Sequence, residues 1–208
     1  MKYSPSGQLF YQKYIHGRKP VVIRNGAKYW PAMKKWKHES YLRKAFGTSM
    51  FTIEYRKSFK NEFPVRKALR LGQFLDIYKT EAVYLDSQFP ETMMIKDILL
   101  PSVLHCNEVV SQITNLNLLF SSGGTSSAFH QDGYENMIAI ISGEKTFILI
   151  NSSYADSLYA DDFQVVPGVL PINLEKVDLK KFSKFANVPY YEVTLKEGMC
   201  AVRLKFRL

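Results

Sequence analysis

One stretch of the chain decides how the rest of the sequence is interpreted: residues 123–136 are Gly-Gly-Thr-Ser-Ser-Ala-Phe-His-Gln-Asp-Gly-Tyr-Glu-Asn. In an extended backbone, side chains two residues apart emerge on the same face, so His130 and Asp132 can direct a nitrogen and a carboxylate oxygen at a common point. Imidazole plus carboxylate, with coordination positions left open, is the ligand chemistry of a divalent ion such as Fe(II). Taken alone, a His-x-Asp triplet is more often a surface pair or a hydrogen-bonded pair near a strand end.

Strand patterns dominate the sequence before and after this stretch, from residue 113 onward. Apolar runs and alternating apolar residues predict strands at residues 113–120, 137–141, 146–150, 190–195 and 201–208. Turns rich in glycine and serine separate the first three of these strands. Short strands joined by tight turns favour an all-β barrel or sandwich in this half over a parallel sheet with crossover helices.

The first half of the sequence mixes helical and strand patterns. The helical patterns fall at residues 9–14, 40–46 and 71–78, and the strand patterns at residues 20–24, 51–55 and 82–85. No repeat, linker or low-complexity tract separates the two halves. We therefore expect a single domain of mainly β structure (α+β) over residues 1–208. In it, helices and strands of residues 1–110 wrap around a β core formed by residues 111–208.

Composition excludes several classes of protein. With 208 residues, 46% hydrophobic and 23% charged, the chain is neither disordered nor collagen-like nor a coiled coil. It has no apolar stretch long enough to cross a bilayer and no signal-peptide core, so we expect no membrane association and a cytoplasmic or nuclear location. Two cysteines exclude a disulfide framework and multi-thiolate zinc sites. The formal charge of +9 would favour RNA as a partner if the basic residues gathered on one face, but they are mostly scattered.

A lysine follows the His-x-Asp pair at the start of an apolar strand. Lys145 comes directly after the turn Ser142-Gly143-Glu144 and before the apolar run 146–150. Such a lysine is either a solvent-facing strand end or a buried cation that requires an anion. If the turn closes a hairpin, the ammonium group folds back toward the strand that carries the two candidate ligands. The sequence then predicts a site that holds a metal ion and, several ångströms away, a carboxylate.

The combined pattern resembles the cupin-type JmjC domains of Fe(II)/2-oxoglutarate oxygenases. The pattern is Gly-Gly-Thr-Ser-Ser-x-x-His-x-Asp, then Glu-Asn, then Ser-Gly-x-Lys before an apolar strand. Residues 19–26 with Trp30-Pro31 resemble the opening strand of the family, and residues 71–75 resemble its characteristic helix, so the likeness covers most of the chain. Within the family the chain is most similar to the small JmjC protein hydroxylases and the tRNA wybutosine hydroxylase. The resemblance implies a double-stranded β-helix, or jelly roll, in the C-terminal half.

The resemblance also implies roles for five residues. His130 and Asp132 would supply two ligands of a two-histidine, one-carboxylate Fe(II) site, and Lys145 would pair with the distal carboxylate of the co-substrate 2-oxoglutarate. Ser127 and Asn136 match positions that often help to hold the co-substrate, although Ser127 would need a local twist or bulge to face the pocket. The implied reaction is the O2-dependent decarboxylation of 2-oxoglutarate to succinate, coupled to hydroxylation of a protein side chain.

The sequence departs from the family pattern at its C-terminal end. The third ligand of the family is a histidine in a downstream Trp-x-His, and no histidine follows His130 here. We therefore expect the last core strands to be missing, iron binding to be weaker and one sheet to have an unpaired edge, which the alternating tail 202–208 could partly cover. Cys200 could donate a thiolate instead, but it lies close to the expected strand start. The remaining histidines are expected to be surface or packing residues: His16, His38 and His105.

Three functions remain open after these observations. The first is a JmjC-type oxygenase whose given form is impaired, for example as a splice form or a misplaced gene-model end. The second is a non-catalytic cupin-like interaction module, either degenerate or completed by a partner. The third is a basic protein that associates with RNA, including a hydroxylase of an RNA-linked substrate.

Overall fold

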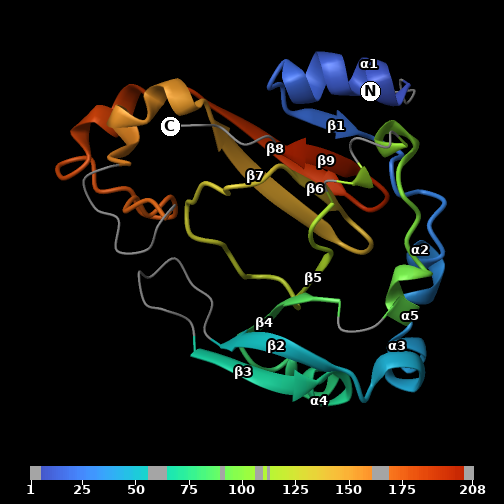
Figure 1. Cartoon of the computed structure of the whole chain (residues 1–208). Helices are drawn as coiled ribbons and strands as arrows, with labels where there is room; N and C mark the ends of the chain where they lie inside the picture. The colour runs from blue at the N-terminus through green and yellow to red at the C-terminus, as the bar shows by residue number, and fades with distance from the viewer. Residues whose placement is uncertain are drawn as a thin grey trace.

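Three antiparallel sheets are found in this computed structural model among the residues that it describes, which are 6–55, 65–89, 92–105, 110–111, 113–160 and 169–203. The strands are β1 (Val21–Ile23), β2 (Met50–Tyr55), β3 (Val65–Arg70), β4 (Val83–Gln88), β5 (Asn117–Phe120), β6 (Asn136–Ala139), β7 (Glu144–Ile150), β8 (Tyr190–Lys196) and β9 (Cys200–Arg203). The sheets have the strand orders β3-β2-β4-β5, β1-β9-β6 and β7-β8. Figure 1 shows the four-stranded sheet apart from the other two, with the segment that connects β5 to β6 running between them.

The helical segments are short. They are α1 (Gly7–Phe10), a π-helix (Tyr11–His16), α2 (Ala32–Lys35), α3 (Glu39–Phe46), α4 (Leu71–Ile77), α5 (Thr92–Ile95) and 3-10 turns at Ser102–Leu104, Ser152–Tyr154, Asp156–Leu158 and Ser183–Asn187. α1 begins after Ser6, whose hydroxyl accepts a hydrogen bond from the Leu9 amide and so caps the helix. Among the described residues, no helix is both long and apolar enough to cross a membrane.

The four-stranded sheet packs one face against helices. Phe51 and Ile53 of β2 alternate with more polar neighbours, and both are buried together with Phe74 of α4 and Leu85 of β4. This alternation places the apolar residues of each strand on the helix-covered face, where they exclude water. The opposite face carries polar side chains such as that of Glu54, which lies directly across from residues of both neighbouring strands.

A long antiparallel ribbon forms the C-terminal half. β6 pairs with β9, and β7 pairs with β8. The two connections, residues 140–143 and 197–199, are hydrogen bonded to each other between Ile140 and both Gly198 and Met199. One connection is a residue longer than the other, and such an extra residue bends an antiparallel ribbon. The ribbon therefore passes from one sheet into the other at this point, as Figure 1 shows.

The predicted hairpin between the strands on either side of Ser142-Gly143-Glu144 is wrong. Gly143 does adopt a positive φ of 76° in a turn, but β6 and β7 lie in different sheets. A turn sequence sets a change of chain direction but does not determine the strand partner, because the paired residues are 40 to 67 positions apart in the chain. An antiparallel ribbon that continues from one sheet into another is a feature of jelly rolls, and the predicted β-rich fold is confirmed.

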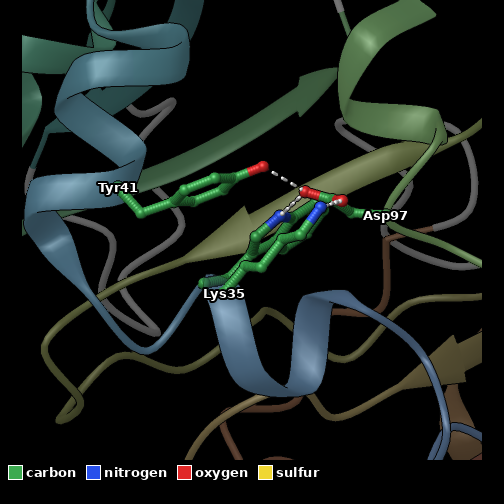
Figure 2. Close-up of polar contacts among 4 residues, drawn as sticks. Lys35, Tyr41 and Asp97 are labelled. Atoms are coloured by element: carbon green, nitrogen blue, oxygen red, sulfur yellow. Dashed lines mark hydrogen bonds and ion pairs between the residues drawn. The ribbon is translucent and has the colours of Figure 1, made fainter.

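A buried carboxylate joins the short helices of the N-terminal half. The Asp97 side chain is 3% exposed and accepts hydrogen bonds from Lys35 Nζ at 2.6 Å, Trp36 Nε1 at 3.0 Å and Tyr41 OH at 2.7 Å. Figure 2 shows these groups converging on it. Burial opposes ionisation of Asp97, but the three donors outweigh this effect and hold its pKa below the ordinary value. The loop after α5 is thereby fastened to α2 and α3.

Candidate metal centre

His130 lies in an extended segment that is held by its neighbours. Its backbone forms an antiparallel bridge with Val169, and the Leu170 amide donates to the Phe129 carbonyl at 2.7 Å. The ring nitrogen Nδ1 is 2.6 Å from the carbonyl oxygen of Ala128. Because a carbonyl oxygen can only accept, Nδ1 carries the hydrogen in this contact. In the neutral ring the other nitrogen, Nε2, then keeps its lone pair, which is the form that binds metals.

Asp132 brings a carboxylate to the same point. Its Oδ1 lies 3.5 Å from Nε2 of His130. Its Oδ2 accepts a hydrogen bond of 2.6 Å from the side-chain amide of Asn136, the first residue of β6. The His130 and Asp132 side chains are 35% and 37% exposed, so the pair can be reached from solvent by small ligands.

The two donor atoms are placed so that one ion can contact both. Nitrogen and oxygen ligands lie about 2.0–2.2 Å from a divalent ion, which puts two adjacent ligands of an octahedral or tetrahedral site about 2.8–3.6 Å apart. The separation of 3.5 Å between Nε2 of His130 and Oδ1 of Asp132 fits this requirement. A protonated His130 would instead form a weak ion pair with Asp132 at this distance. In the described part of the chain, no three or more His, Cys, Asp or Glu side chains gather around one point, so a third ligand of these types is not found there.

Lys145 lies on the inward face of β7. Exposure alternates along the strand, with Lys145 and Phe147 half-buried between exposed neighbours. The cross-strand partner of Lys145 is the fully buried Leu195. The Lys145 ammonium nitrogen lies 3.4 Å from the hydroxyl of Tyr84, and 5.8 and 5.5 Å from the ring centres of Tyr84 and Phe147. Lys145 therefore connects the β7-β8 sheet to β4 of the four-stranded sheet and is not a solvent-facing strand end.

Tyr84 is a candidate site residue that the sequence pattern does not single out. Its side chain is buried on β4, directly across from Glu54 on β2. Burial, assisted by the nearby Asp86 and Glu54 carboxylates, raises the pKa of Tyr84 far above its ordinary value, so its hydroxyl stays protonated and can donate a hydrogen bond. A tyrosine inside an apolar strand signals that its hydroxyl needs a partner. The identity of that partner, Lys145, depends on the tertiary fold.

Comparison with known proteins places the chain in a family. The family profile described as a cupin-like domain matches residues 7–200. The chain belongs to the cupin-like family of JmjC domains. This JmjC-type domain is 29% identical over 206 residues to lysine-specific demethylase 8 of Danio rerio, an alignment that covers 93% of the chain and 50% of that protein.

Two further relatives show a similar identity and a similar coverage. Lysine-specific demethylase 8 of Xenopus tropicalis is 26% identical over 203 residues, covering 93% of the JmjC-type domain and 45% of that protein. The bifunctional peptidase and (3S)-lysyl hydroxylase JMJD7 of Homo sapiens is 25% identical over 162 residues, covering 69% of the domain and 51% of that protein. The chain thus spans about half the length of the curated relatives that it matches.

The other candidate residues of the JmjC-type domain lie in different surroundings. Ser127 is half-buried in the segment before His130, and its side chain forms no hydrogen bond with any other residue in the described ranges. Asn136 contacts Asp132.

Cys200 is fully buried in an apolar cluster, and desolvation raises the pKa of its thiol to about 12, so Cys200 is a packing residue and not a thiolate ligand. His16, His38 and His105 are exposed, as expected. Residues 204–208 of the predicted tail strand lie outside the described residues.

Proposed function

We infer that this protein is an Fe(II)- and 2-oxoglutarate-dependent oxygenase that hydroxylates a protein side chain. The observation that carries the proposal is the His130–Asp132 pair, in which Nε2 and Oδ1 lie 3.5 Å apart while Nδ1 contacts a backbone carbonyl. Membership of the JmjC family supports it, because the resemblance implies this cofactor and this co-substrate. When bound, the iron and 2-oxoglutarate supply the oxidising chemistry, while the protein provides binding, orientation and electrostatics.

Two pairs of residues would bind the metal ion and the co-substrate. His130 and Asp132 would hold the metal ion through Nε2 and Oδ1. Lys145 and Tyr84 would hold the distal carboxylate of 2-oxoglutarate, since an ammonium group and a protonated hydroxyl 3.4 Å apart can donate to the same anion. The aromatic ring of Phe147 beside the ammonium nitrogen would limit the access of water and so strengthen that contact.

The names of the relatives support a protein substrate. They describe one group of relatives as lysine-specific demethylases and another as a (3S)-lysyl hydroxylase, and both names refer to lysine side chains. We therefore extend the proposal to a protein or peptide substrate for this chain.

Formation of succinate tests the proposed function. The purified chain is incubated with Fe(II), ascorbate, oxygen and labelled 2-oxoglutarate, and succinate is followed by NMR. We expect iron-dependent succinate formation that His130→Ala lowers at least about tenfold, because that variant removes a ligand. His38→Ala, which removes an exposed histidine, should equal the wild type. Equal rates for wild type and His130→Ala would contradict the proposal.

A non-catalytic interaction module is the second candidate function. The observation that favours it is the lack of a third His, Cys, Asp or Glu ligand beside His130 and Asp132 within the described residues. Under this alternative the wild-type chain is folded, as judged by cooperative thermal unfolding, and forms no succinate in the same assay.

A further inference from the structure

We propose that Asn136 is a positioning residue, whose side-chain amide orients the Asp132 carboxylate toward the metal position. This inference rests on the proposed function, because the orientation of Asp132 matters only if His130 and Asp132 share a metal ion. It differs from the role that the family resemblance implies for Asn136, which is to line the co-substrate pocket.

The contact uses Oδ2 of the carboxylate, whereas Oδ1 is the oxygen that lies beside His130. Asn136 Nδ2 donates to Oδ2 of Asp132 at 2.6 Å. Oδ1 then faces Nε2 of His130 at 3.5 Å. A hydrogen bond to an ionised carboxylate is shorter and stronger than one between neutral groups. The amide of Asn136 therefore selects one rotation of the Asp132 side chain, in which Oδ1 is the oxygen presented to a metal ion.

Asn136 is well suited to this role because its own backbone is fixed. It is the first residue of β6 and is paired in register with β9. Asp132 lies in a loop outside the strands, four residues earlier. The amide contact thus ties the loop to the end of a strand. His130 is held separately by its bridge to Val169 and by the Ala128 carbonyl, so each candidate ligand has an anchor of its own.

The described contacts place the amide of Asn136 and the ammonium group of Lys145 on different partners. Asn136 donates to Asp132, whereas Lys145 lies against Tyr84 and Phe147. A residue that orients a metal ligand and a residue that binds the co-substrate affect different equilibria when they are removed. The two roles can therefore be separated by measuring metal affinity and 2-oxoglutarate affinity independently.

The test compares Asn136→Ala with the wild-type chain in two titrations. Mn(II) affinity is measured first by calorimetry, and 2-oxoglutarate affinity is then measured with Mn(II) at saturation. Loss of a hydrogen bond that orients a metal ligand lowers metal affinity about ten- to a hundredfold. We expect Asn136→Ala to show a loss in this range for Mn(II) and to keep the 2-oxoglutarate affinity within about threefold.

Two further variants make the result interpretable. Asn117→Ala replaces another asparagine that is the first residue of a strand, β5, and that is exposed, so it should bind Mn(II) as the wild type does. Asn136→Ser keeps a hydrogen-bond donor on a shorter side chain and should fall between wild type and Asn136→Ala. If Asn136→Ala does not fold, as judged by circular dichroism, Asn136→Ser decides the question through the same two titrations.

The outcomes separate this inference from the proposed function. Unchanged Mn(II) affinity in the Asn136 variants overturns the positioning role. Unchanged Mn(II) affinity with weakened 2-oxoglutarate binding assigns Asn136 to the co-substrate pocket instead. Absence of Mn(II) binding by the wild-type chain counts against the proposed function itself, and this result is visible before any variant is measured.

Discussion

Asp97 shows how a single buried charge can hold separate segments of a chain together. Three donors from α2, the residue after it and α3 surround its carboxylate, and Figure 2 shows the side chains meeting at this point. A buried ionised group is favourable only while all its partners are present. We expect Asp97→Asn to lower the free energy of unfolding by about 1.5–3 kcal/mol at neutral pH, the range for hydrogen bonds to a charged group.

The same residue gives a pH dependence with a defined sign. The pKa of Asp97 is lower in the folded chain than its ordinary value, which is about 3.9 in unfolded peptides. Its stabilising contribution is therefore complete above about pH 4–5 and is lost as the pH falls through the lower folded-state pKa. The difference between wild type and Asp97→Asn in urea unfolding should shrink below about pH 4. A difference that stays constant from pH 7 to pH 3 would contradict this account. Asp156→Asn, at an exposed ion pair, should have little effect.

Part of the candidate site could be predicted from the sequence. The two-residue spacing of His130 and Asp132 was sufficient to propose that their side chains share a direction, because this follows from backbone geometry alone. Tyr84 could not be selected in the same way, since its contact with Lys145 joins strands sixty-one residues apart. The hydrogen bond from Asn136 to Asp132 could not be predicted from the sequence either, because it depends on the conformation of the loop between them.

Most strands and helices were predicted at nearly their observed positions. The patterns at residues 51–55 and 71–78 correspond to β2 and α4, for example. β3 was missed because its residues, Val65–Arg70, are largely exposed and basic, as in an edge strand that buries little surface. β5 was placed with the C-terminal core but pairs with β4. Strand existence follows from local pattern, whereas pairing follows from contacts distant in sequence.

The bend of the C-terminal ribbon is expected to require a glycine at position 198. Gly198 has a positive φ of 79°, and its amide donates to Ile140 across the bend. Residues with a Cβ adopt this region at a cost of about 1–2 kcal/mol. Gly198→Ala should therefore lower the free energy of unfolding in urea by about that amount. Gly133→Ala, which has open space around the new methyl group and no positive φ, is the matched control. Equal stability of Gly198→Ala and wild type would argue against a strained bend.

Two separate groups of candidate binding residues come from different parts of the whole molecule. His130 and Asp132 belong to the segment that connects the four-stranded sheet to the ribbon. Lys145 belongs to the ribbon and contacts Tyr84 of the four-stranded sheet. The fold therefore supplies a candidate metal pair from a connecting segment and a candidate anion-binding pair from two different sheets. If both sites act together, metal ion and co-substrate should bind cooperatively.

Calorimetric titration of 2-oxoglutarate, with and without Mn(II), shows whether the two sites act together. We predict that Mn(II) strengthens 2-oxoglutarate binding about 5- to 150-fold, the usual range for coupled sites, and that Lys145→Met or Tyr84→Phe weakens 2-oxoglutarate binding while leaving Mn(II) affinity unchanged. Tyr190→Phe, at an exposed tyrosine, should behave as the wild type. Binding of 2-oxoglutarate that is independent of Mn(II), or no binding of either by the folded chain, would contradict the account.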